Sequence, residues 1–307
     1  MIAFVGRRLV AAVPVIIGVS VVVFASLYLL PGDPIQALTG DLLLSNAQVA
    51  QLRAELGLND PAWVQYLHYA SRALHGDLGV SLESGLPVLG EILTFLPATI
   101  QLTAAAMLFA VVIGVTLGTI AAIRARTWVD SLATVVALGG ASIPSFWLGL
   151  MLLLIFSVWL RWLPSAGTEG LNRLVLPAFT LGYGGAAVIA RLTRSAVLEA
   201  LSQDYITTAR SKGLPERLVI VRHALRNALI PVITILGLQV GTLLSGAVIV
   251  ESVFSRQGIG RMLVNGILAK DLPLVQGTIL FVATTYVLVN IVTDAVYAWV
   301  DPRIRQS

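Results

Sequence analysis

Residues 9–30 read LVAAVPVIIGVSVVVFASLYLL and contain no charged side chain. About 20 apolar residues in a helix cross the hydrocarbon core of a bilayer, so this stretch predicts a membrane-spanning helix. Arg7 and Arg8 precede it, as basic residues precede the core of a secretory signal peptide. The apolar run is longer than the roughly 7–15 residues of a signal core, and no A-x-A cleavage site follows it. We therefore expect an uncleaved signal anchor.

The rest of the chain is also too apolar for a water-facing surface. Hydrophobic residues make up 57% of the 307 residues and charged residues only 12%, against about 25% in soluble domains. We expect six spans in all, and the third should be kinked at Pro144. The five further spans lie at about 95–123, 131–160, 174–189, 228–250 and 274–300.

The distribution of positive charge predicts the orientation of these spans. If both termini are cytosolic, 13 of the 20 Lys and Arg residues lie on the cytosolic side. Positive residues favour the cytosolic side of short loops, so we expect an N-in, C-in chain. The formal net charge of +4 then reflects membrane orientation and does not indicate a nucleic-acid partner.

Three regions follow from this topology. Residues 1–30 form the N-terminus and first span, residues 31–94 an extracytoplasmic cap, and residues 95–307 a core with the remaining five spans. Helical spacing in the cap predicts helices over 47–56 and 61–74. The second would place Trp63, Tyr66, Leu67 and Ala70 on one face, which either packs on the outer membrane face or docks an external partner.

The sequence lacks the groups that would drive transport or catalysis. Asp294 is the only acidic or basic residue inside a predicted span, so we expect a structural intramembrane acid rather than a proton-coupling site. No Gly-x-x-x-x-Gly-Lys-Ser/Thr loop is present to bind nucleotide, and the three histidines lie outside the spans. There is no cysteine. Moving a gate from 1:99 to 99:1 takes about 5.5 kcal/mol of differential binding, which a partner must then supply.

The largest predicted cytosolic segment, residues 191–227, is where such a partner could act. Ser195–Lys212 has helical composition, Gly213-Leu214-Pro215 should break the helix, and Pro215 suits the first turn of the next one. In that second helix Leu218, Val221 and Leu225 recur at helical spacing among basic residues. The segment either couples to a partner or lies on anionic lipid, and the sequence leaves both open.

Residues 204–213, DYITTARSKG, resemble the EAA loop of ABC importer permeases, in the version of the dipeptide/oligopeptide/nickel family. Ala209 and Gly213 match its E-A-A-x-x-x-G core, whereas Thr207 and Thr208 replace the Glu and the first Ala. Further stretches similar to this family occur in order along nearly the whole chain. They are LPGDP at 30–34, GDLGVS at 76–81, LPAT at 96–99, VESVF at 250–254, GIGR at 258–261 and DPRIR at 301–305.

The resemblance implies an all-α fold with six transmembrane helices, the type I ABC importer permease fold, in the inner membrane of a prokaryote. It implies import of di- or oligopeptides, with nickel, another metal chelate or a glutathione-like solute as the alternative within the family. The expected partners are a second homologous permease, two cytosolic ATPase subunits and an extracytoplasmic solute-binding protein. ATP and Mg²⁺ would be bound by the ATPases, so we expect no catalytic, cofactor or metal residue in this chain. A stand-alone secondary transporter is the rival from another class.

The resemblance also implies two sets of functional residues. One set would form the ATPase-coupling loop, and the other would line the outer gate loop at about 251–273. The coupling residues are Asp204, Tyr205, Ala209, Lys212, Gly213, Leu218, Arg222, His223 and Arg226, and the gate residues are Glu251, Phe254, Gly258, Gly260 and Arg261.

Overall fold

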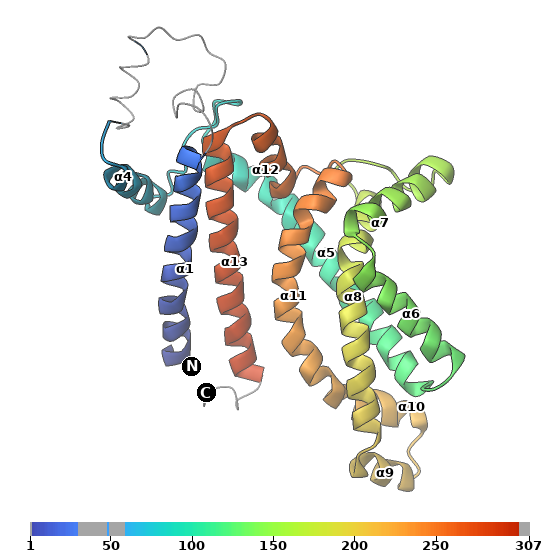
Figure 1. The fold of residues 1–307 in the computed structure, drawn as a ribbon. Coiled ribbons are helices and arrows are strands. Elements are labelled where there is room, and N and C mark those ends of the chain that lie inside the picture. Colours follow the sequence, from blue (N-terminus) through green and yellow to red (C-terminus); the bar gives the residue numbers. More distant parts are fainter. Residues whose placement is uncertain (1, 30–47, 49–58, 301–307) are drawn as a thin grey trace. The chain divides into compact units, whose positions relative to one another are not determined.

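A computed structural model of the chain describes residues 2–29, 48 and 59–300 (Figure 1). Within these ranges the chain is helical and forms no strand, although an isolated bridge pairs Val80 with Pro87. Five helices are long and apolar enough to cross a membrane, and a bent helix pair would make a sixth span. The chain divides into two compact units, Met1–Pro97 with Gln257–Ser307, and Ala98–Arg256.

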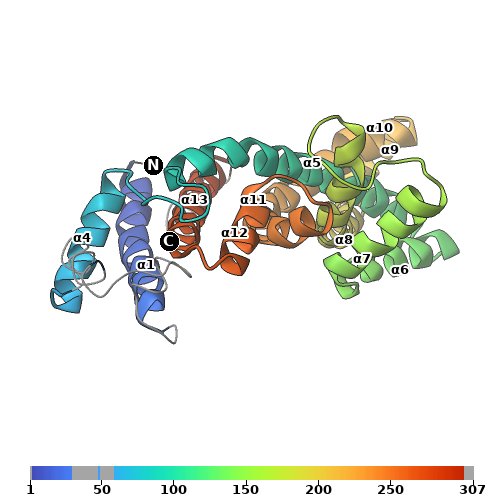
Figure 2. The same ribbon diagram turned by 90° about the horizontal axis from the view of Figure 1, so that it is seen from above.

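The first unit is built on α1 (Ile2–Leu29) and α13 (Leu272–Val300), which run antiparallel side by side (Figures 1 and 2). Helix α1 also contacts α4 (Ala62–Leu74), and α13 contacts α12 (Ile259–Leu268). The start of α5 (Val88–Ile123) packs against α13 and α12 (Ile259–Leu268) in a common apolar core. That core consists of Val88, Ile92, Ile259, Met262 and Leu274.

Helix α4 (Ala62–Leu74) confirms the helix predicted over 61–74 and packs against α1. The hydroxyls of Tyr66 and Ser20 lie 2.8 Å apart, and the Tyr66 ring packs edge-on against Phe24. The predicted face is therefore divided, because Trp63 and Leu67 remain 67% and 57% exposed. The other predicted cap helix, at 47–56, and the motifs at 30–34 and 301–305 lie outside the described residues, residue 48 apart.

The second unit is centred on α8 (Asn172–Leu201), which packs against α6 (Trp128–Ser142) and α11 (Arg226–Val253) (Figure 1). Beyond the end of α8 lie α9 (Asp204–Ser211), α10 (Glu216–Leu218) and the π-helix η2 (Val219–Leu225). The apolar core between the long helices consists of Leu102, Ala106, Leu176, Leu181, Leu243, Ala247, Val250 and Phe254.

The kink predicted at Pro144 is a complete break between helices. Helix α6 ends at Ser142, and α7 (Ser145–Leu152), continued by the π-helix η1 (Leu153–Trp159), leaves at 106° to it. Proline disfavours helical geometry in the residue before it, and Ile143 is extended at φ −86° and ψ 123°. The third predicted span thus consists of two differently directed pieces.

Small residues bring the backbones of α5 and α8 together. A Cβ on Gly118 would clash with the carbonyl oxygen of Ala190 and lie 2.7 Å from the Cβ of Thr193, and a Cβ on Gly182 would lie 2.5 Å from the carbonyl oxygen of Ala106. Close packing of small residues is a main source of helix association in a membrane, where apolar burial alone gives little. The large apolar side chains left exposed on the same helices suit contact with lipid.

We therefore expect Gly118→Ala to destabilise the protein by about 1–3 kcal/mol, because the helices would have to separate to admit the methyl group. The matched control is Gly90→Ala in the same helix, where a Cβ meets no atom within 4 Å. Thermal unfolding of the purified protein in detergent should show a lower midpoint for Gly118→Ala only. Equal midpoints for the two variants would refute the tight packing.

Candidate functional site

The loop segment, residues 202–225, has a small apolar core of its own. Ile206 and Ala209 of α9 pack with Ala200 at the end of α8 and with Val219 and Ala224 of η2. The prediction of one helix over Ser195–Lys212 was wrong, because α8 ends at Leu201 and Gln203 is extended at φ −82° and ψ 151°. This turn brings the buried face of α9 back against η2.

The predicted break at Gly213 is present, and an exposed ion pair spans it. Gly213 has φ +74°, the left-handed region that glycine adopts at little cost, and no atom lies within 4 Å of its missing Cβ. The guanidinium of Arg210 donates to both carboxylate oxygens of Glu216, at 2.6 and 3.1 Å. Pro215 is the N-cap of α10, which begins at Glu216 and forms, with η2, the second arm of the loop segment after α9.

The second arm differs from the predicted amphipathic helix. Val219 and Ala224 are its buried residues, whereas Val221 is 56% exposed. The two buried residues are five apart, which is the hydrogen-bond spacing of a π-helix, and residues 219–225 form one. The predicted apolar stripe assumed the 3.6-residue period of an α-helix and therefore misplaced Val221.

Most of the predicted coupling residues surround this core on its surface. Ala209 is buried, and Leu218 and His223 are partly buried. The others leave an aromatic ring, an acid and several cations accessible at the end of the second unit. These exposed residues are Asp204, Tyr205, Lys212, Gly213, Arg222 and Arg226.

The opposite end of α11 carries two fully covered side chains. Glu251 is 0% exposed, and one of its carboxylate oxygens accepts a 2.6 Å hydrogen bond from the hydroxyl of Thr99. Phe254 is 2% exposed and lies over Gly149, where a Cβ would be 3.1 Å from its ring. A carboxylate at this depth is tolerated because it is hydrogen-bonded.

The remaining predicted gate residues begin a helix. Gly258 precedes α12 with φ −116°, Gly260 is buried in its first turn, and Arg261 is partly exposed. Neither glycine adopts positive φ. Among residues 251–261 the left-handed residue is Ser255, with φ +51°.

Comparison with known proteins assigns the chain to a family. Residues 114–306 match the family described as "Binding-protein-dependent transport system inner membrane component", and residues 1–103 match its N-terminal counterpart. The chain belongs to this family of ABC importer permeases. This permease is therefore a multi-pass inner-membrane transport component.

Relatives and a solved structure agree with the assignment. The permease is 41% identical to the dipeptide transport system permease protein DppB of Escherichia coli K12, over all of both chains. It is 43% identical to the E. coli K12 glutathione transport system permease protein GsiC, over 99% of both. A crystal structure of an amino acid ABC transporter with histidines shares the fold, with a TM-score of 0.51 and 16% identity over 70% of this chain and 94% of that one.

Asp294 of the permease has a charged neighbour on another helix. Its Oδ2 lies 2.9 Å from Nη1 of Arg8, so the ion pair joins α13 to α1. This pairing agrees better with the structural role predicted for Asp294 than with a role in transport coupling.

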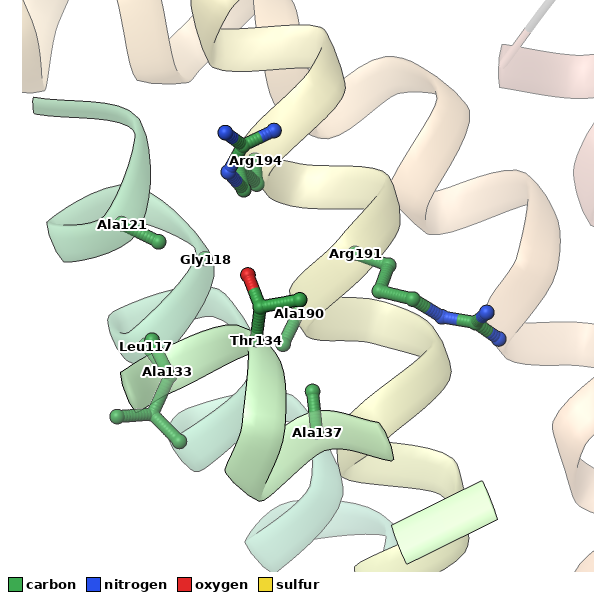
Figure 3. A pocket seen from close by; sticks show the side chains of 9 residues that line it. All are labelled: Leu117, Gly118, Ala121, Ala133, Thr134, Ala137, Ala190, Arg191 and Arg194. Atoms are coloured by element: carbon green, nitrogen blue, oxygen red, sulfur yellow. The ribbon is translucent and has the colours of Figure 1, made fainter. Parts of the chain in front are cut away.

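A recess between α5, α6 and α8 is too small to be the transport site. Its volume is about 10 Å³, roughly one water molecule, and Arg194 lies at its rim while Arg191 points away from it (Figure 3). Arg194 donates to both oxygens of Asp130, at 2.6 and 2.7 Å. This pair anchors the start of α6 to α8 and was not predicted from the sequence.

Sequence reasoning also missed Asp271, which connects residues 81–83 to the start of α13. One of its oxygens, Oδ2, accepts hydrogen bonds from the Ser81 hydroxyl at 2.6 Å and from the amides of Leu82 and Glu83. Its other oxygen accepts from the amide of Leu274 and so caps α13. An aspartate directly before a helix that has proline in its first turn is an N-cap signal, so Asp271-Leu272-Pro273 could have predicted this role.

We expect Asp271→Ala to lower stability by about 2–4 kcal/mol, because it leaves the buried Ser81 hydroxyl and Leu274 amide, and two partly buried amides, without this acceptor. The matched control is Asp77→Ala, which removes an exposed carboxylate that accepts only from the Gly79 amide. Thermal unfolding of the purified permease checks this, and a control that falls as far as Asp271→Ala would contradict it.

Proposed function

We propose that this permease forms part of an ATP-driven importer that carries di- or oligopeptides into the cytoplasm. The observation that carries the proposal is full-length similarity, at 41–43% identity, to permeases named for dipeptide and glutathione transport. Glutathione is itself a small peptide-like molecule, so both names indicate one substrate class. A glutathione-like solute is the second candidate for the same reason.

The exposed side of α11 supports its role as a wall of the pathway. Thr234, Leu238, Thr242, Ser245 and Ile249 follow one another at helical spacing, and all five are exposed. The hydroxyls of Thr234, Thr242 and Ser245 donate to carbonyls of their own helix. This face therefore carries polar groups that need no hydrogen-bond acceptor on another helix. A purely lipid-facing stripe would gain nothing from hydroxyls, whereas a water-facing one would.

The work of transport is assigned to partners. A binding-protein-dependent permease works with an extracytoplasmic solute-binding protein, and we assign ATP and Mg²⁺ to two cytosolic ATPase subunits. A second, related permease would complete the pathway. The exposed residues around the apolar core of the loop segment are the proposed contact with an ATPase, and the chain itself hydrolyses nothing.

Reconstitution into liposomes tests this function. We expect uptake of a labelled dipeptide such as Ala-Ala only when both permeases, both ATPases, internal ATP and the solute-binding protein are present. Glutathione and a nickel chelate, supplied in parallel, report the two alternatives within the family. Accumulation of solute by this chain alone, lost in Asp294→Asn, would instead establish a stand-alone transporter.

Gly213 tests the proposed coupling. We expect Gly213→Val to reduce ATP-driven uptake about tenfold or more, because a β-branched residue disfavours the left-handed backbone that sets the angle between the two arms. Gly213→Asn is the matched control, since asparagine tolerates this conformation. Both variants should assemble, because the space around the residue is open. Normal uptake by an assembled Gly213→Val transporter would refute the coupling role.

A further inference from the structure

Arg256 is the largest fully buried side chain among the described residues. It follows the end of α11, where its backbone amide donates to the carbonyl of Glu251 at 2.9 Å. The residue before it, Ser255, is in the left-handed conformation and turns the chain away from the helix axis. The guanidinium therefore lies under cover beside the end of α11, with an exposed fraction of 0%.

The buried guanidinium has no hydrogen-bond acceptor among the residues that the structure describes. None of its three nitrogens, Nε, Nη1 and Nη2, has a partner. Buried polar groups are nearly always hydrogen-bonded, and a buried cation that lacks acceptors is costly. The five N–H donors of the planar guanidinium therefore lack hydrogen-bond acceptors among the described residues.

A purely structural arginine in the same unit looks different. Arg194 donates through two nitrogens to both oxygens of Asp130, at 2.6 and 2.7 Å. The acid whose charge acts on Arg256 is Glu251, which accepts from Thr99. None of the three guanidinium nitrogens of Arg256 hydrogen-bonds to it. Burial lowers the pKa of Arg256, and the negative charge of Glu251 opposes that shift. An arginine side chain keeps its charge in proteins.

We propose that Arg256 is a substrate-binding residue that receives the terminal carboxylate of the peptide as it passes the outer end of α11. This inference rests on the proposed peptide-import function. A planar guanidinium pairs with a carboxylate through two parallel hydrogen bonds, which a lysine or a neutral donor cannot reproduce. Glu251 supplies charge balance when the site is empty. The guanidinium is covered in this conformation, so the peptide reaches it only when the covering residues move.

The test compares a free peptide with its C-terminal amide. The complete transporter is placed in liposomes, and Ala-Ala and Ala-Ala amide are each supplied at concentrations that saturate the solute-binding protein. Loss of a charge-assisted hydrogen bond weakens binding about 10- to 100-fold. We therefore expect wild-type uptake of the acid to exceed that of the amide by about tenfold or more. In Arg256→Gln uptake of the acid should fall by about the same factor, and uptake of the amide should change less than about twofold.

Two further variants separate recognition from folding. Arg256→Lys keeps the charge and should retain part of the preference for the acid, whereas Arg161→Gln, which removes an exposed arginine in the same unit, should retain all of it. Equal losses for acid and amide in Arg256→Gln would overturn the inference in favour of a structural role, and so would no loss at all. If Arg256→Gln does not assemble, a wild-type ratio near one overturns the inference by itself. A wild-type transporter that carries no peptide would overturn the proposed function as well.

Discussion

Lipid offers no hydrogen bonds to a polypeptide backbone, and the rest of this architecture depends on that constraint. Every spanning segment must satisfy its amides and carbonyls internally, which selects helices. The described helices continue through prolines, as at Pro97 in α5 and Pro231 in α11, each of which removes one helical hydrogen bond. Between α6 and α7 the regular pattern stops altogether, and the chain restarts in a new direction after Pro144.

The same constraint changes what holds helices together. Apolar side chains gain little by leaving lipid for protein, so the contact between α5 and α8 depends on close backbone approach at Gly118 and Gly182. Polar contacts are few and specific. The Arg8–Asp294 pair joins α1 to α13, and the Arg194–Asp130 pair joins α6 to α8. Each lies toward a helix end, where a charge is less costly than at the bilayer centre.

The long apolar runs were predictable because hydropathy and length decide them. The helix break at Gly213 and Pro215 was predictable from turn chemistry, and the helix at 61–74 from its spacing. The π-helix η2 at 219–225 could not be predicted, because its buried residues pack against α9, which is a tertiary contact and not a local preference. Asp271 carried a recognisable N-cap signal, but its bonds to Ser81 and the following amides link residues 190 positions apart. The sequence around Arg256 carries no signal of its burial.

The loop segment between α8 and α11 has a shape that does not depend on any partner. It has an apolar core of its own, and the Arg210–Glu216 contact spans the turn at the left-handed Gly213. A protein that docks there meets a preorganised surface, so the entropic penalty of association is small. The segment is continuous with α8 at one end and with α11 at the other, so a displacement of it would move both helices.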